Sequence, residues 1–510
     1  MSDNSSNNKR IAKNTAFLYL RMILVLFVSL YTTRVVLNVL GIEDYGIYNV
    51  VAGFVSLFTF LNSTMTVGIQ RFYNYEKNSD SIYSQKDVYN TALTVQLIIA
   101  LVILTLLETV GIWYINNVMV VPPDRFTATM WVFQCSTISL LFLILQVPFS
   151  AAIMASERMD YYAAISVLDV LLKLAVVLLL PFVNFDRLIF YGFLSLAISC
   201  LDFLCYFLYC HIKLPEIRFD RRKSTVLLKP MLTFSGWNVL DMSAYTIKAQ
   251  GLNMLLNVFF GPVINAARGI ASQIMGAVQG FSSNVVTAFR PQLVGAYAEG
   301  DFNRTTNLMF SMSKISYIFL YILCLPIVLE LHQILNLWLN GAVPDYTYVF
   351  TILVLADMLI SSLNTPLSQV VQATGKLKWY QILRSILVFS IIPISWLALK
   401  LGAGACSVFW VSLFVVILNQ PVSMYLLHNI YDYSYCTYFK KVLLPIVLFS
   451  IAAPLAPCMV VIFMDESIIR LFLIAFTSIV NSVLMLYLTA LDNQERMILR
   501  TWISNKINCI

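Results

Sequence analysis

Apolar stretches long enough to cross a lipid bilayer recur along almost the whole chain. A membrane-spanning helix needs about 20 predominantly apolar residues. Such stretches lie near 14–38, 46–69, 89–114, 128–153, 162–182, 188–210, 231–257, 263–289, 314–338, 347–371, 380–400, 405–429, 441–464 and 468–490. Only 12% of the 510 residues are charged, whereas soluble domains carry about 25%. We therefore predict an all-α, polytopic integral membrane protein with about fourteen transmembrane helices.

Basic residues are distributed unevenly between the two sides of this predicted bundle. The outer loops hold Arg125, Arg187, Lys400 and Arg470, whereas the inner segments hold most of the others, including the cluster Arg218, Arg221, Arg222 and Lys223. Lys and Arg in short loops stay on the cytoplasmic side. The bias predicts an even number of spans with both termini in the cytoplasm. It also explains the net charge of +7 without nucleic acid, which we do not expect as a partner.

A basic hydrophilic segment divides the chain. We expect an N-terminal lobe at 1–211, a cytoplasmic linker at 212–230, a C-terminal lobe at 231–430, and two extra spans with a cytoplasmic tail at 431–510. A short internal similarity supports the division, since Leu37–Gly41 ends the first span and Leu256–Gly261 ends the seventh. The pattern predicts two six-helix lobes related by an axis along the membrane normal, followed by two C-terminal helices.

Six cations lie at membrane depth: Arg21, Arg34, Lys173, Lys248, Arg268 and Arg384. Each would cost about 2.5–3.5 kcal/mol at the lipid-facing midplane of the bilayer. We expect them to face acids, water or cargo instead. They outnumber the deep acids Asp169, Asp202, Asp241 and Asp357, which indicates an anionic cargo, and a diphosphate head group suits scattered Arg and Lys. Asp169 and Lys173 have the spacing of an ion pair within one helix, and whether that pair is structural or functional stays open.

The predicted eighth span carries one continuous polar stripe. Its members are Asn265, Arg268, Ser272, Gly276, Gln279 and Ser283. Spacings of three and four residues place them on one face of a helix. Small polar residues also serve helix packing in membranes, but packing alone explains the arginine poorly. We therefore predict that Asn265, Arg268 and Gln279 contribute to substrate binding in a central cavity.

Several classes of chemistry leave no trace in the sequence. The three histidines are far apart and no CxxC pair occurs, so we expect no metal site. No GxxxxGK[ST] loop is present, so we expect neither ATP hydrolysis nor any other cofactor chemistry. Glu43 and Asp44 lie where a membrane glycosyltransferase places acids, but no long outer loop could hold a catalytic domain. The sequence predicts a protein that is not an enzyme.

The N-terminal region resembles a known family. The residues that carry the resemblance are Lys13-Asn14-Thr15, Leu30-Tyr31-Thr32-Thr33-Arg34-Val35-Val36-Leu37-Asn38, and Leu40-Gly41-Ile42-Glu43-Asp44-Tyr45-Gly46-Ile47-Tyr48-Asn49-Val50-Val51. They are similar to bacterial Wzx-type polysaccharide flippases of the multidrug/oligosaccharidyl-lipid/polysaccharide exporter superfamily. A leucine-glycine pair, a short gap and then an aromatic-glycine pair between the first two spans are typical there. The length and the span count match along the whole chain.

The resemblance implies two six-helix lobes around a central cavity, followed by two extra helices. It implies that an oligosaccharide linked to undecaprenyl diphosphate moves from the cytoplasmic to the periplasmic leaflet of the bacterial inner membrane, for surface polysaccharides such as O-antigen. Membrane lipids, a polysaccharide polymerase and chain-length proteins are the implied partners. Arginines on the first, second, seventh and eighth spans would bind the diphosphate, and here that role falls to Arg21, Arg34, Lys248 and Arg268. The second span departs from this pattern, with only Arg71 at its inner end.

Two other functions remain open on the sequence. A multidrug/cation antiporter of the same superfamily would favour buried acids and aromatic residues over buried cations. A membrane glycan polymerase or ligase would favour a large outer loop. For a transporter, Asp241 and Asp357 are the candidate groups for coupling to an ion gradient.

Overall fold

The computed structural model describes residues 2–78, 85–156, 158–214, 225–376 and 378–490. Within some helices, including residues 2–23 and 225–241, it describes the backbone but not the side chains. Almost all of the described residues are helical, and none of them lies in a strand. The prediction of an all-α fold is therefore confirmed. Most of the predicted linker at 212–230, and the tail at 491–510, lie outside the described residues.

The chain forms two compact units, each described by itself. Unit 1 comprises Met1–Ile270 and Val388–Val408, and unit 2 comprises Ala271–Leu387 and Phe409–Ile510. The helices up to Ile270 are α1 Ser2–Ser56, α2 Phe60–Asn78, α3 Gln85–Leu106, α4 Ile112–Asn117, α5 Phe126–Ala155, α6 Met159–Leu179, α7 Arg187–Lys213, α8 Thr225–Phe260 and the first part of α9 Pro262–Ala298. The later helices are α10 Phe302–Leu329, α11 Leu331–Leu339, α12 Thr347–Ser362, α13 Asn364–Thr374, α14 Lys378–Lys400, α15 Ser407–His428, α16 Tyr435–Tyr438, α17 Leu444–Ala452, α18 Leu455–Phe463 and α19 Ile468–Met485.

Eleven helical stretches among the described residues are long and apolar enough to cross a membrane. The first of them, Leu24–Thr66, overlaps both the first and the second predicted spans. Helices α8 and α9 correspond to the seventh and eighth predicted spans but are not among the eleven, in keeping with the polar stripe along α9. The ninth predicted span, near 314–338, is divided between two helices, α11 and the longer α10. Helix α10 begins at Phe302. It begins early because Asp301 caps it, its carboxylate accepting a hydrogen bond from the Arg304 N–H at 2.9 Å.

A glycine with positive φ lies at the end of each segment of the predicted repeat. Gly41 lies at a kink within α1 with φ of 85°, and Gly261 separates α8 from α9 with φ of 80°. Glycine adopts positive φ without steric cost, so each segment of the repeat ends in the same kind of turn. The turns also pack together, since a Cβ added to Gly46 would lie 1.9 Å from the carbonyl oxygen of Pro262.

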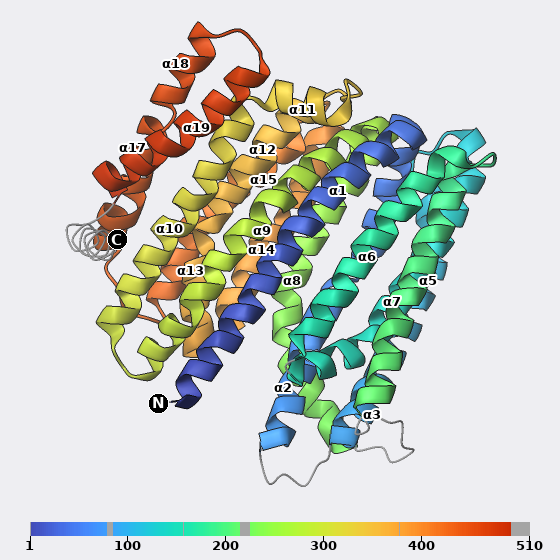
Figure 1. Cartoon of the computed structure of the whole chain (residues 1–510), viewed down its shortest axis with the longest axis horizontal. Coiled ribbons are helices and arrows are strands. Elements are labelled where there is room, and N and C mark those ends of the chain that lie inside the picture. Colours follow the sequence, from blue (N-terminus) through green and yellow to red (C-terminus); the bar gives the residue numbers. More distant parts are fainter. Residues whose placement is uncertain (1, 79–84, 157, 215–224, 377, 491–510) are drawn as a thin grey trace. The chain divides into compact units, whose positions relative to one another are not determined.

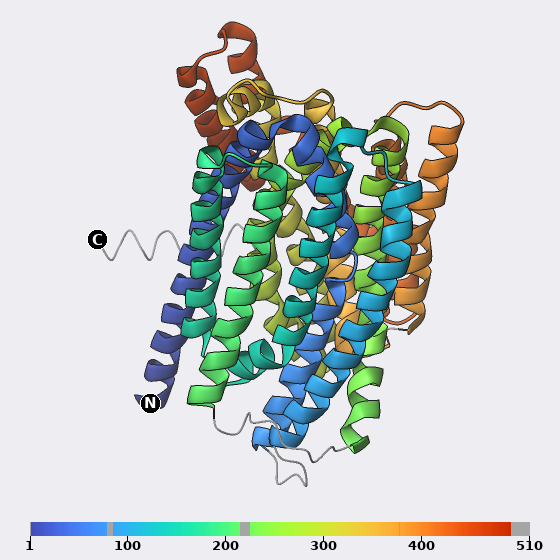
Figure 2. The same cartoon turned by 90° about the vertical axis from the view of Figure 1, so that its right-hand side faces the viewer.

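Unit 1 is held together by packing along the length of its helices. Helices α5 and α7 run side by side, and α6 packs against α1 and α7, as Figure 1 shows. Figure 2 shows the long helices of this unit running roughly parallel to one another. One core cluster includes Ile47, Val50, Phe54 and Phe133. A π-helical turn at Leu107–Gly111 continues α3 beside it, and a side chain at Gly111 would lie 2.6 Å from the Phe133 ring.

Candidate functional site

Three asparagines at membrane depth link three helices of unit 1. Asn265 of α9, which is fully buried, donates hydrogen bonds to the carbonyl oxygen and the side-chain Oδ1 of Asn253 on α8, at 2.7 and 2.8 Å. Asn253 in turn donates to the carbonyl oxygen of Asn49 on α1 at 3.0 Å. We call Asn49, Asn253 and Asn265 the carboxamide cluster. It joins the predicted second, seventh and eighth spans at a common point.

Glycines make room for this cluster. A Cβ on Gly53 would lie 2.5 Å from Gln250 Oε1 and 2.7 Å from Asn253 Nδ2. A Cβ on Gly269 would lie 2.8 Å from both side-chain polar atoms of Asn49. Such distances are shorter than non-bonded contacts allow, so these positions require glycine for close approach.

Replacing Gly269 with Ala is expected to displace the Asn49 side chain and to lower the thermal stability of the protein, because the added Cβ would lie 2.8 Å from the Asn49 side chain. Overpacking of this kind costs about 1–3 kcal/mol. The melting temperature should be measured on the purified variant. Gly276→Ala is the matched control, because a Cβ at that position of the same helix meets nothing within 4 Å. Equal melting temperatures for the two variants would contradict the prediction.

Arg268 lies one turn beyond Asn265 on α9. Its Nη2 donates to the carbonyl oxygen of Ala249 on α8 at 2.5 Å. Its Nε and the Oδ1 of Asn265 are buried, and neither has a hydrogen-bond partner in the described part of the chain. No carboxylate among the described residues pairs with this guanidinium. A buried donor without a partner is costly in free energy. The Nε–H of Arg268 can therefore still donate a hydrogen bond to an oxygen of an anion or of water.

For the other predicted binding residues, the structure describes fewer contacts. Arg34 on α1 and Lys248 on α8 are half-buried, and Lys248 makes contacts within the structure. Gln279 lies further along α9 and is exposed. The side chains of Arg21 and Asp241 lie outside the described residues. The structure thus shows that Asn265 and Arg268 both hydrogen-bond to α8, and the binding role of all the predicted residues stays a prediction.

In unit 2, Asp357 lies among hydroxyl groups. Ser412 of α15 donates to its Oδ2 at 2.5 Å, and Ser361 of the same helix, α12, donates to its Oδ1 at 3.4 Å. Arg384 on α14 is also buried, with its guanidinium 5.1 Å from the centre of the Tyr380 ring. Two serine hydroxyls thus donate to the carboxyl group of Asp357, and such hydrogen bonds stabilise its ionised form. The other predicted coupling acid is Asp241.

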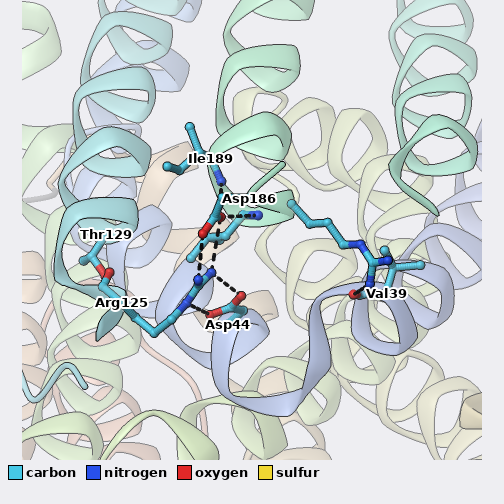
Figure 3. Close-up of polar contacts among 8 residues, drawn as sticks. Val39, Asp44, Arg125, Thr129, Asp186 and Ile189 are labelled. Carbon is cyan, nitrogen blue, oxygen red and sulfur yellow. Dashed lines mark hydrogen bonds and ion pairs between the residues drawn. The ribbon is translucent and has the colours of Figure 1, made fainter. Parts of the chain in front are cut away.

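Unit 1 also contains a charged cluster that the sequence did not predict. It lies at the predicted outer end of the spans (Figure 3). Arg125 donates to both oxygens of Asp44, with Nε at 2.7 Å from Oδ1, and its Nη1 donates to Asp186 Oδ2 at 2.6 Å. Asp186 also caps α7 by accepting hydrogen bonds from the N–H groups of Leu188 and Ile189. Burial opposes ionisation of Asp186, but the bonds from Arg125 and from the α7 backbone outweigh it and lower its pKa.

The sequence contained only a weak signal for this cluster. Two predicted spans separate Asp44 from Arg125, and four separate Asp44 from Asp186. Spacing along the chain therefore could not pair these residues. The cluster ties the turn after Gly41 to the beginnings of α5 and α7. Because both oxygens of Asp44 bind Arg125, this acid is held in a structural role.

Comparisons with known proteins identify the fold. No protein-family model matches the chain, and no curated protein matches its sequence. A solved structure of the lipid II flippase MurJ in an inward closed conformation aligns with a TM-score of 0.70 and 14% identity, covering 93% of this chain and 98% of that one. An inward-facing multidrug resistance MATE family transporter of the MOP superfamily aligns with a TM-score of 0.59 and 12% identity, over 82% and 96% of the two chains. A eukaryotic MATE transporter aligns with a TM-score of 0.59 and 15% identity, over 85% and 98%. The chain is thus a multi-pass membrane protein with the fold of a lipid II flippase and of MATE transporters.

Proposed function

We propose that this protein is a flippase that moves an oligosaccharide linked to undecaprenyl diphosphate from the cytoplasmic to the periplasmic leaflet of a bacterial inner membrane. The observation that carries the proposal is Arg268, a guanidinium at membrane depth with an unused buried N–H and no carboxylate partner among the described residues. A guanidinium binds diphosphate oxygens through charge-assisted hydrogen bonds. The fold, which is shared with a flippase named for lipid II, supports the same class of cargo.

In this proposal the cargo crosses by alternating access. Arg268 binds the diphosphate together with Arg21, Arg34 and Lys248, while Asn265 and Gln279 donate to the head group or to the sugars. The lipid tail stays in the bilayer. The moving parts are the lobes at 1–211 and 231–430, and coupling to an ion gradient uses Asp241 or Asp357.

The proposal makes the protein a transporter and not an enzyme. Of the two acids that would suit a glycosyltransferase, Glu43 and Asp44, the second is bound by Arg125 at both oxygens and is not free to act as a base. The protein would supply flipped glycan to a polysaccharide polymerase and to chain-length proteins for surface polysaccharide. Both of its termini would lie in the cytoplasm.

A multidrug/cation antiporter is the second candidate. Asp357, with serine hydroxyls at 2.5 and 3.4 Å, resembles a site for a cation, and MATE transporters share the fold. A cationic drug, however, would be repelled by Arg268. The two functions therefore predict opposite charge on the preferred cargo.

The deciding experiment depletes the protein from the cells that make it. Undecaprenyl-diphosphate-linked glycan is expected to accumulate in the cytoplasmic leaflet while surface glycan falls at least about tenfold, because a diphosphate head group does not cross lipid unaided. Leaflet-specific labelling of the lipid-linked sugar measures this. Depletion of a strain that lacks the glycan's first glycosyltransferase is the control. Unchanged surface glycan together with new sensitivity to cationic drugs would favour the antiporter.

A further inference from the structure

Helix α6 has two exposed faces of opposite character. Leu168, Leu171 and Leu178 are 41–47% exposed and form an apolar face suited to lipid. Lys173 lies five residues from Leu168 and Leu178 and two from Leu171, which places it roughly opposite them at 3.6 residues per turn. Its side chain is nevertheless 59% exposed. The protein therefore leaves Lys173 uncovered on the side of α6 opposite these leucines.

Lys173 is part of a three-membered charged cluster. Its Nζ binds Asp169 Oδ2 of the same helix at 2.8 Å. The carboxyl group of Asp202 on α7 lies within hydrogen-bonding reach of Asp169 and close to Lys173. Asp202 also lies on the inner side of its helix, two residues from the exposed Leu204 and nine from the exposed Phe193. All three residues lie near the middle of the fifth and sixth predicted spans.

A direct hydrogen bond between the two acids requires a proton. Two ionised carboxylates repel each other and offer no donor, whereas a protonated carboxyl can donate to an ionised one. Asp202 Oδ1 is moreover buried without a hydrogen-bond partner in the described part of the chain. With one proton on Asp202, the cluster holds one carboxylate, one ammonium and no net charge. Loss of that proton leaves a net charge of −1 at membrane depth, which is costly.

Neighbouring helices add few other charges. On helix α7, Cys205 lies one turn beyond Asp202, and the Arg, Lys and His residues of this helix, Arg187, His211 and Lys213, lie at its ends. Helix α1 packs against α6 and carries Arg34, and also Arg21, whose side chain is not described. Helix α5 has no charged residue. Within the described residues, the balance of charge at Asp202 is thus set by Asp169 and Lys173.

We propose that Asp169, Asp202 and Lys173 form a proton-binding site in unit 1, in which Asp202 takes up and releases the proton and the Asp169–Lys173 pair compensates the charge. The proton moves between Asp202 and water, and no other bond is made or broken. This site differs from the coupling acids Asp241 and Asp357. Its use in driving transport rests on the proposed function, whereas proton binding itself does not.

Infrared spectroscopy of the full-length protein in lipid nanodiscs tests the site without any cargo. Stepping the pH upward from about 5 should remove the C=O absorption of a protonated carboxyl. Asp202→Asn should abolish that titrating absorption. Lys173→Met should raise the pH at which this absorption disappears by at least about one unit, because a positive neighbour that favours ionisation of the carboxyl group is gone. Asp124→Asn, at an exposed acid of the same unit, should leave the absorption unchanged.

Two outcomes would overturn the proposal. One is a titrating absorption that survives both Asp202→Asn and Asp169→Asn, and the other is a Lys173→Met variant that titrates at the pH of the parent protein. If Asp202→Asn does not fold, Asp169→Asn and Lys173→Met decide the question. A site that titrates as expected in a protein that flips no glycan would retain this inference and refute the proposed function.

Discussion

Arg268→Ala is expected to weaken binding of an undecaprenyl-diphosphate head group by about 10- to 100-fold. A hydrogen bond to a charged group contributes about 1.5–3 kcal/mol, and about 1.4 kcal/mol corresponds to a factor of ten. The cost to folding should be smaller, because the Ala249 carbonyl that Arg268 binds also belongs to the hydrogen-bond ladder of α8. Binding is measured by titrating nanodisc-embedded protein with undecaprenyl diphosphate, and surface glycan is measured in cells.

Two further variants separate charge from geometry. Arg268→Lys keeps the charge but loses the planar fork of donors, so it should bind more tightly than the Ala variant and less tightly than the parent. Arg304→Ala is the matched control, since Arg304 is 53% exposed and pairs with Glu299 at 3.6 Å on the surface of unit 2. Parental affinity in Arg268→Ala at a normal protein level would remove Arg268 from the site.

The spans could be predicted because the bilayer imposes a length and a composition that are visible in any single stretch. A rule based on length and composition does not detect helix caps, so the predicted boundary was wrong at the start of α10, which Asp301 caps. It also does not detect the break at residues 57–59, which separates α2 from the end of α1 within one predicted span. A turn of this kind depends on packing that hydropathy does not report.

The site could be predicted only in part, for a related reason. Arg268 and Asn265 were found because they lie on one face of one helix. Their partners Ala249 and Asn253 lie on α8, and contacts between helices leave no periodic signal. Lys173 illustrates the same limit, since its spacing predicted the ion pair with Asp169 but not Asp202, which approaches from α7.

Arg470→Met is expected to destabilise the protein by roughly 3–5 kcal/mol, because it leaves the charge of Glu330 buried and unpaired. Glu330 and Arg470 are 2% and 9% exposed, and the guanidinium donates to both carboxylate oxygens at 2.7 and 3.0 Å. Its Nη1 also donates to the carbonyl oxygen of Met464 at 2.9 Å. The pair joins the end of α10 to the first turn of α19, within unit 2.

A double-mutant cycle separates the interaction from the effect of each side chain. Glu330→Gln should destabilise by a similar amount, whereas Glu330→Gln combined with Arg470→Met should lose much less than the sum, since neither charge is then left unpaired. Unfolding is followed by the loss of the monodisperse peak on heating. The exposed pair Arg304–Glu299 provides the comparison cycle and should give less than about 1 kcal/mol. Equal coupling energies for the two pairs would mean that the contact at Glu330 is solvated, and that α19 is attached to α10 by apolar packing rather than by charge.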